Sequence, residues 1–366
     1  MRIAFFHELH FGGARRVVVE YGKVFAKNHE IELFYIDRGK EYDIEKVFRK
    51  SHFYKFNFKK YEGGDFLLKA YKDLIEPIKL YFLHKKIAND VDKEKFDFVF
   101  IHPSQFTHAP FILRFLKTPH LYFCQEPLRI AHDPIVGLPK NISLIKKIYE
   151  IFIRNIRKEI DTSNIKHAKA VIANSNYSKQ NIKKAYGIES YVCYLGADPS
   201  VFKPLNIEKE YDLIFVGNET FIEGYDTFKE IVDLFDNKLK VRVVKPKKGK
   251  YITDEDLAGE YNKAKVLVVL GRFDPFSMIP WEGMSCEVVP VVVKEGGPVE
   301  ALDDGNTGFL VERDPKKFKK IIEKLLNNED LRNLIGQSGR KQVLQKWNWE
   351  KSSDRIFEII NKKLKI

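Results

Sequence analysis

The sequence predicts an α/β fold made of two doubly wound, Rossmann-like parallel-sheet domains. The length of 366 residues suits two domains of ordinary size rather than one. Short apolar runs recur along the chain with helical stretches between them, which is typical of a parallel sheet covered by helices. The clearest case is the pair of runs 266–270 and 288–293, which flank a loop and a short helix as in a βαβ unit.

The first domain is expected over residues 1–198. A helix opens at Gly12 and Gly13, directly after the first strand, and runs to about Lys27. Glycines at such a turn let backbone amides approach a phosphate group without interference from a Cβ atom, although a simple tight turn has the same composition. Strands are expected at residues 2–6, 31–36, 96–101, 119–124 and 170–173.

Residues 42–92 are less regular than the rest of this domain. Aromatic residues alternate with lysines over Phe53–Tyr61, and a helical stretch follows over residues 65–89. The alternation is compatible with an edge strand, a membrane-docking surface or a site for single-stranded nucleic acid. We favour the edge strand first and the membrane surface second.

A second basic stretch is the amphipathic helix expected over residues 141–160. Its polar side is either a solvated face or a peripheral contact with a membrane. The cations on that side are Lys146, Lys147, Arg154, Arg157 and Lys158.

The second domain is expected over residues 211–345, after a linker at 199–210. Residues 346–366 contain a final helix. The strands of the second domain are predicted at residues 211–217, 239–244, 266–270 and 288–293.

Composition restricts the class of protein. No apolar run approaches the ~20 residues that span a bilayer. The N-terminus enters a strand without a signal pattern, so we expect a cytoplasmic protein, or one that is peripheral on the inner face of the membrane. The cysteines Cys124, Cys193 and Cys286 lie far apart and form no CxxC pair, which favours reduced thiols and argues against a zinc site.

The net charge of +12 calls for an acidic partner or surface. Anionic lipid and polyphosphate-linked substrates both fit, so an anionic membrane surface is a candidate partner. No helix-turn-helix, RRM-like or zinc-finger pattern is present, and no nucleic-acid partner is expected.

Two carboxylates bracket the short helix of the second domain. Asp274 falls in the loop at the carboxyl end of the strand 266–270, where open α/β sheets bind their ligands. Pro280 suits the first helical turn, and Glu282 follows about one turn into the helix, facing the same crevice. The helix N-terminus attracts an anion, and the carboxylates suit hydroxyl groups. A sugar phosphate offers both.

Further motifs give the chain a family resemblance. Asp274 and Glu282 form an acid–seven residues–Glu pattern. Glu295–Glu300 reads Glu-Gly-Gly-Pro-Val-Glu, and Gly305–Val311 reads Gly-Asn-Thr-Gly-Phe-Leu-Val. With the glycine pair of the first domain, these motifs resemble the family 4 glycosyltransferases, whose fold is called GT-B. The resemblance covers nearly the whole chain and implies two domains facing each other across a cleft, with a nucleotide sugar as the donor. It also implies that the final helix, in residues 346–366, crosses back onto the first domain.

The resemblance also implies roles for residues that bind the donor, most of them in the second domain. Asp274 would hold the transferred sugar, and Glu282 would bind the ribose hydroxyls. Gly12, Gly13 and the amides of Ser277 and Met278 would stabilise the leaving phosphate. Four further residues are candidates for the donor site: Gly217, Lys245, Arg272 and Phe276.

In the first domain, Gln125 stands where many relatives have a catalytic-site histidine. Gln125 and Glu126 could hydrogen-bond the acceptor or the transferred sugar. His102 and Arg129 are candidates for acceptor binding, with His102 serving either this role or structure alone. No metal site and no cofactor are expected.

Two positions depart from the family pattern. After Gly217 the family supplies an arginine and then a Lys-Gly pair that neutralise the donor diphosphate, but this chain has Asn218 and Glu223 there. Two like charges about 4 Å apart repel by ~4 kcal/mol at an effective dielectric of about 20, so Glu223 disfavours a diphosphate unless it turns away. Compensating cations are expected at Lys245, Lys247, Lys248 and Arg272.

The sequence therefore predicts a retaining, metal-independent hexosyltransferase. Its donor would be a nucleoside diphosphate sugar, with GDP-mannose or a UDP-hexose as candidates, and its acceptor a lipid-linked glycan, an oligosaccharide or a polysaccharide. The alternative is a non-transferring relative, either a sugar-nucleotide epimerase or a degenerate sugar-nucleotide-binding subunit. A nucleic-acid-binding protein, whose affinity would fall steeply with salt, leaves the motifs of both halves unexplained.

Overall fold

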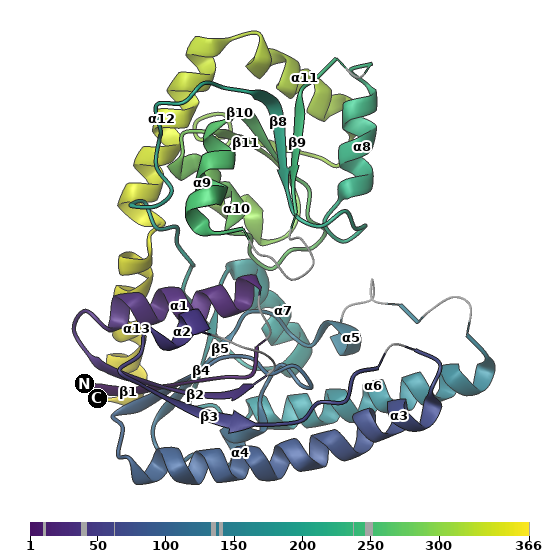
Figure 1. The fold of residues 1–366 in the computed structure, drawn as a ribbon, viewed down its shortest axis with the longest axis vertical. Helices are drawn as coiled ribbons and strands as arrows, with labels where there is room; N and C mark the ends of the chain where they lie inside the picture. The colour runs from purple at the N-terminus through teal and green to yellow at the C-terminus, as the bar shows by residue number, and fades with distance from the viewer. Residues whose placement is uncertain are drawn as a thin grey trace. The chain divides into compact units, whose positions relative to one another are not determined.

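The computed structural model describes residues 1–9, 12–37, 42–61, 63–132, 137–138, 142–236, 238–245 and 252–365. Contacts divide the chain into two compact units (Figure 1). The first comprises Met1–Asn174, Ser178–Cys193 and Ser353–Ile366, and the second comprises Ser175–Tyr177 and Tyr194–Ser352.

The first unit is built on a parallel sheet. Within the described residues it has seven strands, in the order β3-β2-β1-β4-β5-β6-β7. β4, β5 and β6 are buried along their whole length, because helices cover both faces of the sheet. The strands are β1 (Arg2–His7), β2 (Glu30–Asp37), β3 (Lys50–Lys55), β4 (Phe98–Ile101), β5 (His120–Cys124), β6 (Ala170–Ala173) and β7 (Tyr191–Val192).

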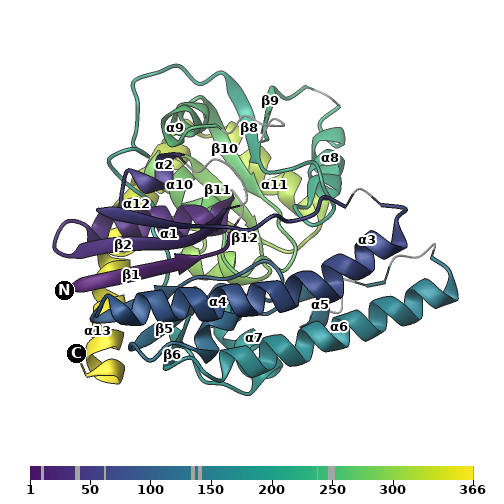
Figure 2. The ribbon, with the colours of Figure 1, turned by 60° about the horizontal axis from the view of Figure 1, so that its bottom comes forward.

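Helices pack on the two faces of this sheet (Figures 1 and 2). Phe25 of α1 contacts Phe5 on one face, with ring centroids 5.4 Å apart. Leu80 of α4 belongs to the core on the other face, with Phe6. The helices are α1 (Gly13–Phe25), α2 (Tyr42–Glu45), α3 (Phe66–Ala70), the π-helical η1 (Tyr71–Ile75), α4 (Glu76–Lys93), the short 3₁₀ helix η2 (Phe111–Arg114), α5 (Arg129–His132), α6 (Leu144–Ile165) and α7 (Asn176–Tyr186).

The irregular region of the first unit has a mixed outcome. β3 is the edge strand, as we favoured, but it ends at Lys55, and residues 56–61 lie outside any strand. The single helix expected over residues 65–89 is interrupted by η1. Pro77 lies in the first turn of α4 and has no N–H to bond the preceding turn, which is the usual cause of such an irregularity.

The second unit contains a smaller parallel sheet. Its five strands, counted within the described residues, follow the order β12-β11-β10-β8-β9. α8 and α11 pack on one face, where Phe228 and Phe318 are buried, and α9 packs on the other face through Tyr261. The elements are β8 (Tyr211–Val216), α8 (Tyr225–Asp233), β9 (Val241–Val244), α9 (Asp254–Asn262), β10 (Ala264–Val269), α10 (Ile279–Ser285), β11 (Val289–Val293), the 3₁₀ helix η3 (Gly297–Ala301), β12 (Phe309–Val311), α11 (Pro315–Leu326) and α12 (Glu329–Lys346).

The last helix, α13 (Trp349–Leu364), belongs to the first unit from Ser353 onward. Its Phe357 contacts Phe25 and His29 of the first unit, with ring centroids 4.9 and 4.7 Å away. The two units are thus both Rossmann-like α/β layers with all-parallel sheets, which is the predicted fold class. Among the described residues, no helix is both long enough and apolar enough to cross a membrane.

Candidate functional site

Asp274 lies in the loop between β10 and α10, at the carboxyl end of a central strand of the second sheet. Its Oδ1 accepts a hydrogen bond from the backbone N–H of Phe276 at 2.9 Å, so the carboxylate stabilises its own turn. The Oδ2 lies over Gly271, where an added Cβ atom would be 3.4 Å away. Phe276 is nearly buried and packs on Trp281, with ring centroids 4.0 Å apart. The loop therefore has a fixed shape.

A glycine pair holds this loop from the other side. The backbone N–H of Gly297 donates to the carbonyl oxygen of Asp274 at 2.8 Å. A Cβ atom on Gly297 would lie 2.0 Å from the carbonyl oxygen of Pro275, so only glycine permits this approach. Ser175, which belongs to the second unit, donates its hydroxyl to the same Pro275 oxygen at 2.7 Å.

Glu300 completes this part of the second unit, although the sequence suggested no role for it beyond its place in the motif. Its carboxylate accepts hydrogen bonds from the backbone N–H groups of Asn176 and Tyr177, at 2.9 and 2.8 Å, and from the Tyr194 hydroxyl at 2.8 Å. Burial, followed by the bond to Glu300, raises the pKa of Tyr194. The signal for this contact was the Gly-Gly-x-x-Glu spacing, which does not reveal a partner 124 residues away.

The helix α10 begins as predicted, with Met278 as its N-cap and Pro280 in its first turn. Ser277 precedes it and is 6% exposed. Glu282 is in the first turn but does not present its carboxylate to solvent: the residue is 2% exposed, and its Oε2 accepts a hydrogen bond from the Tyr261 hydroxyl at 2.9 Å. Glu282 therefore lies in the expected helical turn, but its carboxylate is buried and does not face an open crevice beside Asp274.

The carboxylate of Glu223 lies against the carboxyl end of β8. A Cβ atom on Gly217 would be 3.2 Å from the Glu223 Oε2, so the side chain does not turn away from this turn. Gly217 itself has a φ of 146°, and Gly224 has a φ of 78° with a Cβ position only 2.1 Å from the Leu270 carbonyl oxygen. Both positions therefore favour glycine, and they flank the segment that carries Glu223.

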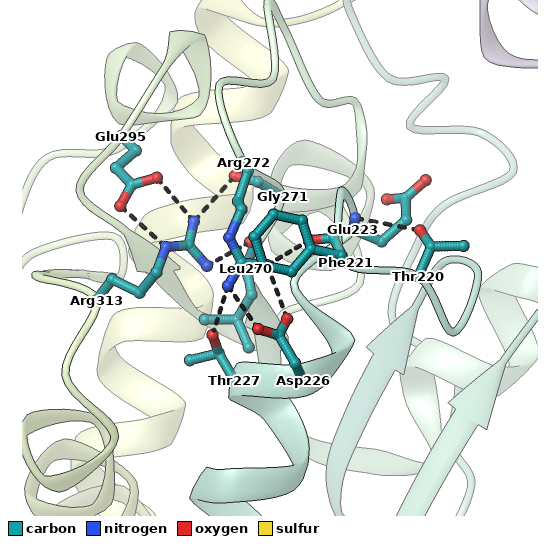
Figure 3. A network of polar contacts seen from close by, with 10 residues as sticks. All are labelled: Thr220, Phe221, Glu223, Asp226, Thr227, Leu270, Gly271, Arg272, Glu295 and Arg313. Atoms are coloured by element: carbon teal, nitrogen blue, oxygen red, sulfur yellow. Dashed lines mark hydrogen bonds and ion pairs between the residues drawn. The ribbon is translucent and has the colours of Figure 1, made fainter. Parts of the chain in front are cut away.

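Two of the four cations nominated to offset Glu223, Arg272 and Lys245, are already paired with acids. Arg272 makes two bonds of 2.7 Å to Asp226 and stacks on Phe221, with its guanidinium 3.8 Å from the ring centroid (Figure 3). Those bonds lower the pKa of Asp226. Lys245 lies 2.6 Å from Glu219 and lowers its pKa. Lys247 and Lys248 lie outside the described residues.

A second arginine supports the loop that carries Asp274. Arg313, in the segment after β12, donates to the carbonyl oxygen of Leu270 at 2.9 Å and pairs with Glu295 at 2.7 Å (Figure 3). Arg313 thus joins the start of the Asp274 loop to the start of the Gly-Gly turn. Sequence reasoning missed this contact, because only the fold brings residues 270, 295 and 313 together.

In the first unit, the structure brings the glycine turn and Gln125 together. Gly12 is the N-cap of α1, with a φ of 156°, and Gly13 is its first residue. Gln125 donates its side-chain amide to the carbonyl oxygen of Ala14 at 3.3 Å, within the first turn of α1. The side chains of Glu126 and Arg129 form an ion pair at 3.8 Å and are about a quarter exposed.

His102 does not fit the acceptor-binding role considered for it. It is 0% exposed, and its ring contacts those of Phe5, Phe100 and Phe123. Three adjacent strands supply this aromatic environment, so the histidine is part of the core. Of the two interpretations offered by the sequence, the structure supports the structural one.

Acidification is expected to destabilise the first unit through His7 and His102. Burial, assisted by Arg15, lowers the pKa of His7 to about 3, and burial lowers that of His102 well below its usual value. Both are neutral in the folded state, so the unfolded chain binds more protons below pH ~6.5, and stability present above that pH is lost as the pH falls. Each histidine should cost about 2 kcal/mol at pH 5.

The measurement is hydrogen–deuterium exchange of the β1 and β4 amides at pH 7 and pH 5, corrected for intrinsic exchange. His102→Phe suits the aromatic surroundings and removes one titrating group. The stability that this variant loses between pH 7 and pH 5 should therefore be smaller than the wild-type loss by the contribution of one histidine. An unchanged pH dependence in this variant would contradict the assignment to His102.

Among the residues that the structure describes, no group of three or more His, Cys, Asp or Glu side chains could hold a metal ion.

Comparison with known proteins identifies the family. The model for Glycosyltransferase Family 4 matches residues 11–201, more than half of the chain. The chain belongs to glycosyltransferase family 4. A second model, Glycosyl transferases group 1, matches residues 201–342 of this family 4 chain.

Individual relatives match shorter stretches. An uncharacterized glycosyltransferase of Methanocaldococcus jannaschii is 37% identical over 98 residues, which is 26% of this chain and 28% of the relative. The human alpha-1,3/1,6-mannosyltransferase ALG2 is 26% identical over 153 residues, which is 40% of this chain and 35% of ALG2. The matches thus span about a third of the length of these relatives.

Solved structures match over the whole length and show the GT-B fold of the family 4 enzymes. Sucrose-phosphate synthase from Thermosynechococcus elongatus superposes with a TM-score of 0.74 at 14% identity, covering 100% of this chain and 99% of that one. HepE from Anabaena, in complex with UDP and glucose, superposes with a TM-score of 0.66 at 14% identity, covering 99% of both chains.

Proposed function

We propose that this family 4 glycosyltransferase moves a hexose from a nucleoside diphosphate sugar to a lipid-linked glycan or polysaccharide, with retention and without a metal ion. The observation that carries the proposal is the fixed position of Asp274, which the Gly296–Gly297 turn, Ser175 and Arg313 support from several sides. A carboxylate held at the carboxyl end of β10 suits the hydroxyl groups of a sugar. The mannosyltransferase ALG2 supports a hexose as the transferred group.

The remaining site residues have proposed roles that follow the family pattern. The amides of Gly12, Gly13, Ser277 and Met278 would stabilise the leaving phosphate as its charge develops, an effect worth several kcal/mol. Glu282 would bind the ribose, for which its carboxylate must become accessible when the donor binds. Transfer would follow a same-face route without a covalent intermediate.

On the acceptor side, the proposal keeps Gln125, Glu126 and Arg129. Gln125 lies beside the first turn of α1, close to the glycine pair. Glu126 and Arg129 are paired and partly exposed, so they can exchange their mutual contact for hydroxyl groups of an acceptor. His102 is left out of the proposal because three phenylalanine rings from adjacent strands surround its buried ring.

A second candidate function is favoured by Glu223. Its carboxylate lies beside Gly217, where the family places a cation for the donor diphosphate, and both Arg272 and Lys245 are paired with acids. A degenerate sugar-nucleotide-binding subunit, or an epimerase that converts the donor without an acceptor, therefore remains the alternative. The three functions differ in whether a diphosphate binds, whether the bound sugar nucleotide is altered without an acceptor, and whether sugar is transferred.

The deciding experiment is calorimetric binding of GDP, UDP, ADP, TDP and their hexose conjugates in the absence of metal. Binding of one diphosphate at micromolar strength, ~8 kcal/mol, would support a working donor site and identify the base. Incubation of that sugar nucleotide alone then separates an epimerase, which alters it, from a transferase, which needs an acceptor. Absence of binding by every compound would favour a degenerate subunit whose altered phosphate site no longer holds a diphosphate.

Glu223→Lys is expected to tighten diphosphate binding at least tenfold, because it replaces a repulsion of up to ~4 kcal/mol with an attraction. The gain in affinity should decrease as the salt concentration is raised, because salt screens the attraction between the lysine and the diphosphate. Glu323→Lys makes the same charge change on α11, where Glu323 is 48% exposed, and should leave the affinity unchanged. Equal effects of the two variants would show that net charge, rather than the position of Glu223, controls binding.

A further inference from the structure

The first half of α6 presents an apolar stripe to solvent. It consists of Leu144, Ile145, Ile148, Ile151 and Phe152, which are 48–76% exposed. Their spacing of three and four residues places them on one side of the helix. A helix of a globular protein normally turns such a side into the core, but the buried residues of α6 begin only at Ile153. We call these five residues the α6 stripe.

The neighbouring helices extend the same feature. α3 and α4 run alongside α6 in both views (Figures 1 and 2), and contacts join them: Lys69 pairs with Glu150 at 2.9 Å, and the Tyr149 hydroxyl donates to Asp73 at 3.2 Å. Six exposed large apolar residues lie between Phe66 and Phe82. With the α6 stripe they make eleven of the 21 such residues among those the structure describes as exposed.

These helices are also strongly basic. Residues 66–86 carry five lysines and two acids, and residues 144–158 carry five cations and one acid. The two stretches therefore supply seven of the chain's twelve net positive charges. Lys146 and Lys147 lie between members of the α6 stripe, so cations and exposed apolar side chains belong to the same helical turns.

We propose that the α6 stripe lies in the interface of an anionic lipid membrane. Its apolar side chains would enter the boundary between headgroups and acyl chains, and the lysines would contact lipid phosphates. The cations of α6 exclude a spanning orientation, which agrees with the absence of a membrane-spanning helix among the described residues. A helix that lies in the plane of the membrane can place its apolar side toward the acyl chains and its basic side toward the headgroups.

Charge decides between a membrane and a second copy of the chain. In a symmetric dimer the same patch would face itself, and its seven net positive charges would be brought against seven others. Charged residues are also depleted from the core of protein interfaces. An anionic bilayer meets the apolar side chains and the cations together. The inference does not depend on the identity of the donor or acceptor.

The test is flotation of the purified full-length protein with phosphatidylcholine vesicles, with and without phosphatidylglycerol. Binding is expected only to the anionic vesicles, and raising the salt from about 0.1 M to about 1 M, which shortens the Debye length from ~10 to ~3 Å, should release the protein. The variant Ile145→Gln, Ile148→Gln, Phe152→Gln should bind at least tenfold more weakly. The double variant Lys146→Gln, Lys147→Gln should also bind more weakly, by about fivefold for each lysine removed.

Matched controls keep the result specific to the α6 stripe. Leu334→Gln with Leu344→Gln removes two exposed leucines of α12, and Lys316→Gln with Lys320→Gln removes two lysines of α11; both pairs should bind as the wild type does. Thermal unfolding verifies that every variant is folded. Failure of the wild type to bind anionic vesicles, or wild-type binding by the triple variant, overturns the inference. A dimer in sedimentation velocity that the triple variant dissociates also overturns it, in favour of a second copy.

Discussion

Asp274→Asn is expected to lower kcat/KM for sugar transfer about 10²–10³-fold while leaving the fold intact. Asparagine retains an oxygen at the position of Oδ1, so it can still accept the hydrogen bond that the Phe276 N–H donates at 2.9 Å. It removes only the negative charge. The loss should therefore fall on kcat rather than on stability, because the charge acts on the transferred sugar as the transition state forms.

Two further variants separate charge from shape. Asp274→Ala also removes the turn hydrogen bond, so it should add a loss of stability of about 1 kcal/mol to the loss of activity. Asp236→Asn changes an acid whose side chain is 79% exposed, and it should alter neither property. The measurements are initial rates with the sugar nucleotide identified by calorimetry, and urea unfolding of each variant. Full activity of Asp274→Asn would remove this carboxylate from the reaction.

The fold could be predicted because its signals are local. β4, β6 and β11 are buried on both faces, so each appears in the sequence as a continuous apolar run. The glycine that ends a strand or opens a helix is also a local signal, as at Gly12. The π-helical turn η1 was not predictable in this way, because its residues have ordinary helical composition and the irregularity comes from Pro77 in the following turn.

The candidate site was predicted only in part, because charge partners are not local. The spacing of acids and glycines led to Asp274, Glu282 and the Gly296–Gly297 turn. It did not reveal that Arg272 would be neutralised by Asp226, 46 residues away, or Lys245 by Glu219, 26 residues away. A cation in a sequence is a donor-site candidate until the fold shows which acid it meets.

Burial caused the other differences between expectation and structure. His102 follows a strand and was a fair candidate for a ligand-binding residue, but Phe5, Phe100 and Phe123 come from three adjacent strands and enclose it. Glu282 has the expected place in α10, yet Tyr261 from α9 supplies its hydrogen bond. Which side chains enclose a residue depends on the order of the strands in the sheet. The sequence of a single strand does not reveal that order.

Gly297→Ala is expected to have the largest structural effect of any single change at the site. Its Cβ atom would lie 2.0 Å from the carbonyl oxygen of Pro275, far inside the contact distance. Either the Asp274 loop moves and loses the 2.8 Å bond between Gly297 N–H and Asp274 O, or the second unit accepts the strain. We expect a loss of 1–3 kcal/mol in the free energy of unfolding, together with a loss of transfer comparable to that of Asp274→Asn.

Gly259→Ala is the matched control, because it makes the same change inside α9, where a Cβ atom meets nothing within 4 Å. It should stabilise the protein by up to ~1 kcal/mol and leave activity unchanged. Transfer rates of the two variants are measured well below their unfolding temperatures. The comparison then distinguishes an effect of the turn on stability from an effect on the position of Asp274. If Gly297→Ala is destabilised but transfers at the wild-type rate, the Gly-Gly turn serves the fold alone. A variant that is folded at the assay temperature but inactive would show that the turn acts by holding Asp274 in place.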